Sequence, residues 1–280
     1  MPTAKQKAEL FAQLHEREDK ALILPNAWDV GSARILEAMG FEAIATTSAG
    51  FAFSLGKRDW PGEVSRAEAL GMCKAVVKAV NVPVSADLEH GYGLKPETVA
   101  ETIRQAAAAG LAGCTIEDTS GKPDAPIIDF QHAVERISAA VQARNALKRP
   151  FILTARAENF LHGRPDLDET ISRLIAFEAA GADVLYAPGL STLDQIAQVC
   201  EAVSKPVNVV IGTAASHFTV GQLEAAGVRR ISMGSSFARA ALGGFLQAAR
   251  EVINKGTFEF AQYAASFAQL DELLSRDRNS

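Results

Sequence analysis

Acidic side chains and an arginine directly follow three apolar segments that have the pattern of buried strands. The stretch SADLEHGYG (Ser85–Gly93) comes after the apolar run NVPV and contains two carboxylates, a histidine and two glycines. Glu117 follows the next such segment, and Arg156 and Glu158 follow the third. Carboxylates that lie close together repel one another unless they share protons or bind a cation. Oxygen ligands suit Mg²⁺ and Mn²⁺, so this pattern predicts a divalent-metal site.

Four acids are the predicted metal ligands. Side chains alternate along a strand, which places Asp87 and Glu89 on the same side. Glu117 ends the next strand and Asp59 lies in a loop after an earlier one, so all four are predicted to converge on one point. The alternative is that these acids are solvated at the rim of the site or pair with nearby arginines. Acids at adjacent strand ends, with glycines that permit close backbone approach, favour the metal site.

A repeated unit indicates which elements position these residues. Four segments share one pattern, a helix that ends in alanine and glycine followed by a short apolar strand; they start at Glu37, Ala107, Glu178 and Glu224. Glycine suits a helix C-terminus because it adopts the left-handed conformation without steric cost. Three further strands begin at a proline, in NVPVSAD, KRPFILTAR and SKPVNVV. With an early strand at residues 21–24, the pattern predicts eight strands separated by helices.

The predicted fold is a (β/α)8 barrel in a single domain, residues 1–280. Strands separated by helices pair in parallel, and short continuous apolar strands fit a sheet covered on both faces. An open doubly wound sheet is the alternative, but the chain has no GxGxxG loop. Two helical segments lie outside the repeat, residues 3–18 and residues 236–280. The first is predicted to close one end of the barrel with Leu10, Phe11 and Leu14.

Composition excludes several classes of function. The 280 residues carry a net charge of −5, with 28 basic and 33 acidic residues mixed along the chain. There is no basic stripe for nucleic acid, no polybasic membrane-binding cluster and no apolar run long enough to span a bilayer. Three distant cysteines without a CxxC pair are predicted to be reduced thiols. Because the amino-terminal segment lacks the apolar core of a signal peptide, we expect a cytoplasmic protein without nucleic-acid or membrane partners.

The combination of SADLEHGYG, TIED and TARAEN, spaced as here, resembles the isocitrate lyase and phosphoenolpyruvate mutase superfamily. The segment PNAWDVGSARILEAMGFEAIATTSAG and the GKRD loop fit the same family, so the resemblance covers about residues 22–233. It implies a Mg²⁺-dependent barrel, with Mn²⁺ as a substitute, that acts on small 2-oxo or 2-hydroxy carboxylates through an enolate-like intermediate. It also implies that subunits exchange the eighth helix, within residues 236–280, and form homodimers that pair into homotetramers.

The resemblance implies roles for individual residues. Asp87 would be the main metal ligand, and Asp59, Glu89 and Glu117 would hold the metal directly or through its waters. Arg156 would stabilise the oxyanion of the enolate. The catalytic candidates are Arg156, Glu117, Glu158 and His90. The candidates for substrate binding are Trp28, Thr47, Ser48, Ala49, Asp87, Arg156 and Asn208, the last of them toward the distal end of the substrate.

The segment after Glu117 departs from the family pattern. Isocitrate and methylisocitrate lyases carry a loop of the lysine-lysine-cysteine-glycine-histidine type there, whose cysteine serves as an acid–base group. This chain reads IEDTSGKPDAPIID, which is shorter and has neither cysteine nor histidine, and Cys114 is predicted to face the helices. The asparagine-rich lid of the mutases and phosphonopyruvate hydrolases is absent as well. These departures argue against isocitrate lyase activity and against phosphorus–carbon chemistry.

We therefore predict a lyase that cleaves or decarboxylates a C–C bond of a small 2-oxo or 2-hydroxy carboxylate. Cleavage of a 2-hydroxy acid needs a base for the hydroxyl, and Glu158, Tyr92 and His90 are the candidates. Two valines and an isoleucine follow Asn208, which predicts a less polar or shorter substrate end there. Chemistry of the phosphonopyruvate hydrolase or phosphoenolpyruvate mutase type is the alternative reaction. A non-catalytic oxo-acid-binding protein is the alternative class.

Overall fold

A closed parallel sheet forms the centre of the computed structural model, which describes the chain except for residues 61, 213–214, 216 and 276–280. The strand order is β1-β9-β8-β7-β6-β5-β4-β3-β2. The strands are β1 (Leu22–Leu24), β2 (Asn26–Ala27), β3 (Ile44–Thr46), β4 (Val84–Asp87), β5 (Gly113–Glu117), β6 (Ile152–Arg156), β7 (Val184–Tyr186), β8 (Val207–Val210) and β9 (Arg230–Ser232). Only Pro25 separates β1 from β2, and β1 pairs with β9 while β2 pairs with β3. The predicted (β/α)8 barrel is confirmed, with its first strand divided at a proline that has no N–H for the ladder.

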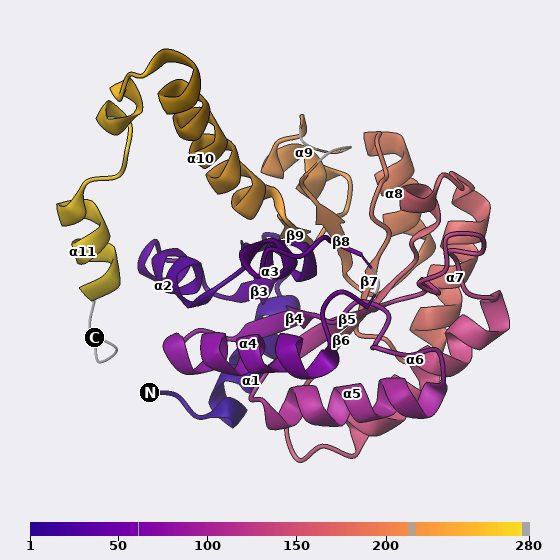
Figure 1. Ribbon diagram of the computed structural model, residues 1–280. Helices are drawn as coiled ribbons and strands as arrows, with labels where there is room; N and C mark the ends of the chain where they lie inside the picture. Colours follow the sequence, from indigo (N-terminus) through magenta and orange to yellow (C-terminus); the bar gives the residue numbers. More distant parts are fainter. Residues whose placement is uncertain (61, 213–214, 216, 276–280) are drawn as a thin grey trace.

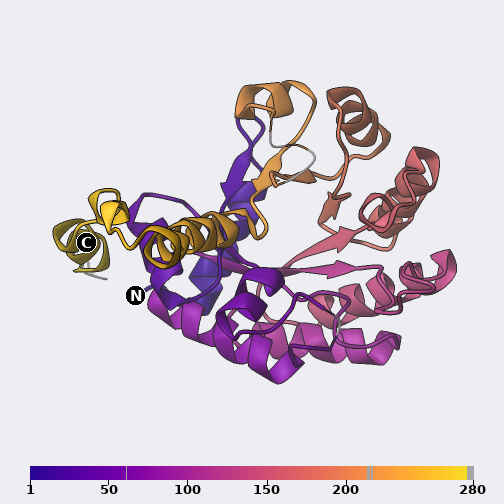
Figure 2. The same ribbon diagram turned by 45° about the horizontal axis from the view of Figure 1, so that its top comes forward.

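The described chain forms eleven α-helices, most of which cover the outside of the barrel and alternate with its strands (Figures 1 and 2). They are α1 (Ala4–His15), α2 (Val30–Ala38), α3 (Ser48–Ser54), α4 (Arg66–Ala79), α5 (Pro96–Ala108), α6 (Phe130–Asn145), α7 (Leu167–Ala179), α8 (Leu193–Ala202), α9 (Val220–Ala225), α10 (Ser236–Lys255) and α11 (Phe267–Ser275), with short 3₁₀ turns η1 (Asn159–His162) and η2 (Glu259–Gln262). The four repeat glycines, Gly40, Gly110, Gly181 and Gly227, have φ between 91° and 104°. They end helices in the left-handed region, as the sequence predicts. None of the helices in the described chain is long and apolar enough to cross a membrane.

Helix α1 closes the amino-terminal end of the barrel. Phe11 and Leu14 are buried against the first residues of the strands, in a cluster that includes Leu22 and Leu24. The predicted plug is therefore confirmed, but Leu10 does not belong to it, because its side chain is 40% exposed. The buried face of α1 follows the spacing of Lys7, Phe11 and Leu14, and Leu10 lies outside that arc. The closed end leaves the carboxyl ends of the strands as the open mouth.

Helix α10 extends away from the barrel, as both Figure 1 and Figure 2 show. Of its 20 residues only Ala238 is buried. Phe245 is 68% exposed and Ile253 is 82% exposed, and the apolar exposure continues to Tyr263 and Phe267 in the segment after α10. Helix α11 lies beside α2. Residues 276–280, the end of the segment predicted to be exchanged, lie outside the described residues.

We predict that this exposed apolar face packs against a second copy of the chain. Burying a large apolar side chain is worth about 1.5–3 kcal/mol, so a double variant with Phe245→Asp and Ile253→Asp should be a folded monomer while the parent sediments as an oligomer. Gln247→Asp, on an exposed position of the same helix, is the matched control and should keep the parent's mass. A parent that sediments as a monomer at micromolar concentration would contradict the prediction.

Candidate active site

A cavity of about 730 Å³ opens at the carboxyl ends of the strands. The predicted site residues that line it are Thr47, Ser48, Ala49, Asp59, Asp87, Glu89, His90, Glu117, Arg156, Glu158 and Asn208. The parallel register explains this convergence, because Glu117, Arg156, Tyr186 and Asn208 are successive partners across β5 to β8. Trp28 does not line the cavity; its backbone N–H donates to the Ser32 hydroxyl at 3.1 Å. Its position gives no support to the prediction that it binds substrate.

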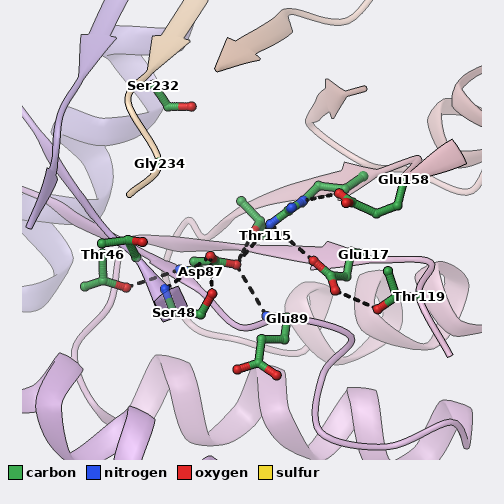
Figure 3. A network of polar contacts seen from close by, with 12 residues as sticks. Thr46, Ser48, Asp87, Glu89, Thr115, Glu117, Thr119, Glu158, Ser232 and Gly234 are labelled. Carbon is green, nitrogen blue, oxygen red and sulfur yellow. Dashed lines mark hydrogen bonds and ion pairs between the residues drawn. The ribbon is translucent and has the colours of Figure 1, made fainter. Parts of the chain in front are cut away.

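Asp87 is the most heavily contacted acid in the cavity (Figure 3). The Ser48 hydroxyl donates to its Oδ2 at 2.8 Å. Its Oδ1 accepts from the Thr115 hydroxyl at 3.2 Å and from Arg156 at 3.1 Å. These donors hold the last side chain of β4 in one orientation toward the cavity. Thr115, which the sequence analysis did not single out, lies beside Asp87 because the two residues are register partners across β4 and β5.

Glu89 reaches the cavity through a strained turn. Strand β4 ends at Asp87, and Glu89 has φ 50°, a left-handed conformation that is uncommon for a residue other than glycine. Its backbone N–H faces Asp87 Oδ1 at 3.4 Å, whereas its carboxylate points away from Asp87 in Figure 3. Tyr92, in the same loop, has φ 62°. Glu89 does line the cavity, but the predicted cause is wrong. Its side chain is positioned by a turn after β4 and not by alternation along a strand. Such strain concentrates at functional sites.

Arg156 lies at the centre of the charged residues. Its Nη1 is 3.1 Å from Asp87 and 3.3 Å from Glu117, and its Nε is 2.7 Å from Glu158. The guanidinium carbon lies 4.9 Å from the centroid of the Tyr186 ring. Against the burial that lowers it, Glu158, Glu117 and Asp87 raise the pKa of Arg156 well above its ordinary value. Arg156 is therefore a fixed cation on the wall of the cavity.

Only some of the predicted metal ligands pair with Arg156. The alternative interpretation, in which the acids pair with nearby arginines, holds for Asp87 and Glu117. Arg58 binds Glu63 and contributes no charge to the group. Asp59 and Glu89 form no ion pair within the described residues. Burial, with Asp87 and Glu117 nearby, raises the pKa of Asp59. Burial, followed by Asp87, Glu117 and Asp59, raises the pKa of Glu89 to about 8. Asp59 and Glu89 are therefore the cavity acids that form no ion pair with Arg156.

The predicted convergence of four acids on one point is not seen. Within the described part of the chain, no three histidine, cysteine, aspartate or glutamate side chains are arranged to hold a metal ion. The physical reason is that Arg156 bridges Asp87 and Glu117, while the Glu89 carboxylate is directed elsewhere. A cation in this cavity would have one or two direct carboxylate ligands and would complete its shell with water.

The three candidate bases have different surroundings. Glu158 is 3% exposed, and burial raises its pKa to about 8 although Arg156 donates to it. Burial lowers the pKa of His90 below its ordinary 6.5. Burial strongly raises the pKa of Tyr92, whose hydroxyl is buried and has no hydrogen-bond partner among the described residues. Glu158 and His90 line the cavity.

The cysteines are packing residues. Cys73 and Cys114 are buried among the core side chains and Cys200 is partly buried. Burial raises the pKa of Cys73 to about 12 and that of Cys200 to about 11. It raises the pKa of Cys114 as well. Neutral thiols away from the cavity fit the prediction that none of the cysteines is an acid–base group.

Two residues that line the cavity, Tyr186 and Arg230, were not predicted as site residues from the sequence. Tyr186 lies under the Arg156 guanidinium, and Arg230 on β9 lines the cavity although it is 2% exposed. Arg230 had a signal, a basic residue within the apolar strand segment VRRISM. Val210, after Asn208, also lines the cavity, so the less polar or shorter substrate end expected there stays a prediction.

Comparison with known proteins decides the family. Residues 11–253 match the family model described as phosphoenolpyruvate phosphomutase. The chain belongs to the phosphoenolpyruvate mutase/isocitrate lyase superfamily. Among relatives in this superfamily, an uncharacterized protein of Mycobacterium tuberculosis (strain CDC 1551 / Oshkosh) is 33% identical over 243 residues, which are 86% of this chain and 88% of that protein. An oxaloacetate decarboxylase of Paraburkholderia xenovorans (strain LB400) is 32% identical over 205 residues, which are 70% of this chain and 65% of that protein.

Solved structures agree with the superfamily assignment. A protein of Burkholderia cenocepacia J2315, provisionally named a lyase/mutase, is 51% identical with a TM-score of 0.95, and the match covers 99% of this chain and 98% of that one. A 2,3-dimethylmalate lyase of the same superfamily is 25% identical with a TM-score of 0.84, covering 98% of this chain and 95% of that one. Relatives in the superfamily thus include decarboxylases, C–C lyases and mutases.

Proposed function

We propose that this protein is a Mg²⁺-dependent lyase that cleaves or decarboxylates a C–C bond of a small 2-oxo or 2-hydroxy carboxylate. The observation that carries the proposal is the position of Arg156, a buried cation held by three carboxylates on the wall of an open cavity. The names of relatives support the class, since they include an oxaloacetate decarboxylase and a 2,3-dimethylmalate lyase.

The residues present fit a magnesium ion. Asp59 and Glu89, which form no ion pair within the described residues, offer carboxylate oxygens, and burial together with Asp87, Glu117 and Asp59 raises the pKa of Glu89. A cation beside Glu89 would favour its ionised form. Mg²⁺ usually retains several waters and binds one or two carboxylates together with its substrate. Asp87 would be the direct ligand, with Asp59, Glu89 and Glu117 around its waters. When bound, the ion supplies a Lewis acid that polarises a substrate oxygen.

Arg156 supplies the positive charge needed when the C–C bond breaks. In decarboxylation of a 2-oxo acid the electron pair of the broken bond moves to the oxygen on C2, where negative charge develops. In cleavage of a 2-hydroxy acid the oxygen on C2 carries the negative charge once its proton has been removed, before the C–C bond breaks. A fixed guanidinium that needs no reorganisation stabilises such charge in a site with little water. Glu158 and the Tyr186 ring hold the guanidinium in place at 2.7 Å and 4.9 Å. Arg156 would therefore act on the transition state more than on the bound substrate.

Residues of the cavity could also bind the substrate carboxylate and transfer the proton of a substrate hydroxyl. The Ser48 hydroxyl and the first turn of α3 face the cavity beside Asp87. Thr47 is a weaker candidate for binding the substrate carboxylate, because its N–H already donates to the Ala27 carbonyl at 3.2 Å and its hydroxyl accepts from the Gly50 N–H at 3.3 Å. Glu158, with a pKa of about 8, would accept the proton of a substrate hydroxyl and return it to the carbanion.

A substrate screen tests this proposal. The protein would be incubated with Mg²⁺ and a panel of 2-oxo and 2-hydroxy acids, and release of pyruvate, glyoxylate or carbon dioxide would be measured. The expected result is turnover of at least one acid that EDTA abolishes and Mg²⁺ restores. Release of inorganic phosphate from phosphonopyruvate in place of these products would favour the phosphorus–carbon alternative. Binding of oxalate without turnover of any acid would favour a binding protein.

The pH profile distinguishes the three candidate bases for a 2-hydroxy acid. A base acts only when it is deprotonated, so kcat/KM should rise about tenfold per pH unit and level off above the pKa of the base. With Glu158 as base the plateau should begin near pH 8. With His90 it would begin below 6.5, and with Tyr92 the rate would still rise above pH 10. Glu158→Gln should abolish the rise, and a profile unchanged in that variant would exclude Glu158.

A further inference from the structure

The turn between β4 and α5 contains two residues that line the cavity, Glu89 and His90. Glu89 and Tyr92 have φ of 50° and 62°, and Gly91 between them has φ of 77°. Residues other than glycine adopt this left-handed conformation rarely, and they keep it only where the surrounding structure enforces it. The contacts that hold the turn therefore decide where the Glu89 carboxylate lies.

Arg136, on helix α6, binds both halves of this turn. Its side chain is 1% exposed, and its Nη2 donates to the His90 carbonyl and, at 3.4 Å, to the Gly93 carbonyl. Its Nη1 donates to the carbonyl of Glu117, the last residue of β5, at 3.1 Å. One guanidinium therefore links the backbone that carries Glu89 to the backbone that carries Glu117.

Two further contacts hold the same turn. The backbone N–H of Glu117 donates to the Glu89 carbonyl at 3.0 Å. The Thr102 hydroxyl, buried on α5, lies 2.8 Å from the Gly91 carbonyl oxygen. The carbonyl groups of the turn thus bind α5, β5 and Arg136, while the Glu89 side chain lines the cavity.

Arg136 is a buried cation that binds only backbone carbonyls. Within the described residues it forms no ion pair, and its Nε has no hydrogen-bond partner. Burial lowers the pKa of Arg136 to about 10, against the charges of Asp118 and Glu117, which raise it. Arg136 is therefore charged at neutral pH. A buried charge is unfavourable unless hydrogen bonds compensate for it, and an apolar side chain would serve the packing of α6 better, so the role of Arg136 lies in the carbonyls that it binds.

We propose that Arg136 is a positioning residue that fixes the spacing of Glu89 and Glu117 and thereby makes the cavity select Mg²⁺ over larger divalent cations. This proposal rests on the proposed function, in which acids of the cavity surround Mg²⁺ and its waters. Mg²⁺ requires a nearly ideal octahedral shell with short bonds, whereas Ca²⁺ accepts longer bonds and a more flexible arrangement. A fixed spacing therefore favours Mg²⁺, and a turn that can relax loses the preference. Arg136 does not line the cavity, so it acts through the two acids.

Metal binding by Arg136→Gln tests the proposal. Calorimetry with MgCl₂ or CaCl₂ would be done in excess pyruvate, a 2-oxo acid that precipitates neither metal. Groups that orient metal ligands from outside typically change metal affinity by about 10–100-fold. Arg136→Gln should therefore bind Mg²⁺ at least tenfold more weakly than the parent and change the Ca²⁺ affinity less than threefold. Arg136→Lys keeps the charge but reaches fewer carbonyls, so its ratio of Mg²⁺ to Ca²⁺ affinity should be intermediate.

Arg149→Gln is the matched control. Arg149 also donates to backbone carbonyls, those of Ala107 and Leu111 at 2.8 Å and 2.7 Å, but it does not line the cavity or contact the turn. Its replacement removes the same kind of bonds at another place in the barrel. The ratio of Mg²⁺ to Ca²⁺ affinity should stay within threefold of the parent's, whatever the change in thermal stability.

A double-mutant cycle tests the route through Glu89. Glu89→Gln removes the carboxylate that the turn presents, so adding Arg136→Gln to that variant should change the ratio of Mg²⁺ to Ca²⁺ affinity less than threefold. A tenfold decrease of the ratio in both backgrounds would show that Arg136 acts on the barrel as a whole. That result would overturn the positioning role.

Failure of this inference is distinguishable from failure of the proposed function. A parent that binds no Mg²⁺ would overturn the proposed function and the inference with it. A parent that binds Mg²⁺ no more tightly than Ca²⁺, or a folded Arg136→Gln variant that keeps the parent's ratio, would overturn the inference alone. Thr102→Val loosens the same turn from α5 with a side chain of similar shape, and it decides if neither Arg136 variant folds. Its ratio should fall at least threefold, and an unchanged ratio would contradict the proposal.

Discussion

Replacing Asp87 with alanine is expected to abolish turnover and Mg²⁺ binding together while the barrel stays folded. Asp87 ends β4 at the mouth of the barrel, where its carboxylate accepts from Ser48, Thr115 and Arg156. Its loss removes the proposed direct ligand. Stabilisation of transition-state charge by a bound cation is worth several kcal/mol, and about 1.4 kcal/mol corresponds to tenfold in rate. Activity should therefore fall by about a thousandfold or more.

The matched control for this variant is Asp118→Asn. Asp118 follows Glu117 directly but is 2% exposed and pairs with Arg173 at 3.2 Å outside the cavity. Its replacement should lower the thermal stability and leave the affinity for Mg²⁺ unchanged. Calorimetry with Mg²⁺ and oxalate measures the affinity of both variants. Parent-like Mg²⁺ binding by a folded Asp87→Ala variant, or no binding by the parent, would contradict the assignment of Asp87.

The architecture could be predicted because each repeat has its own local end signal. Gly40 and Gly110 end helices in conformations that other residues adopt with strain, and such signals depend on the chain's nearest neighbours alone. The exposure of Leu10 could not be predicted in the same way. It depends on which arc of α1 faces the strand ends, and that is decided by packing against Leu22 and Leu24.

The position of a site residue could be predicted from the sequence where that residue lies within a strand or at its end. Glu117 and Arg156 lie on strands and are register partners, so their proximity follows from the fold. Glu89 comes after its strand, and its left-handed backbone is set by the turn that follows. Arg230 was missed because Arg229 and Arg230 are consecutive, and alternation along a strand allows either of them to point into the barrel while the other points toward the helices. Only the register with Asn208 decides between the two.

Arg156→Gln is expected to change activity and metal affinity in opposite directions. Removing one fixed donor from a site that stabilises developing negative charge lowers kcat by about 10²–10³-fold, and the loss of a full charge should place this variant at the upper end. Mg²⁺ affinity without substrate should rise, because Arg156 is a competing cation 3.1 Å from Asp87 and 3.3 Å from Glu117. Glu158 would lose its partner, but because Arg156 lowers the Glu158 pKa, its removal should raise that pKa further and keep Glu158 neutral at pH 7, so the variant should fold.

Arg156→Lys separates the charge from the geometry of the guanidinium. A lysine keeps one positive charge, but its single nitrogen cannot repeat the contacts that Nη1 and Nε make with Asp87, Glu117 and Glu158. Its kcat should therefore lie between those of the parent and Arg156→Gln, and its Mg²⁺ affinity should stay near the parent's. Steady-state kinetics and calorimetry on the same preparations measure both quantities. If Arg156→Gln retained kcat within tenfold of the parent, Arg156 would be a structural partner of the acids, and the electron sink would have to be assigned to another group.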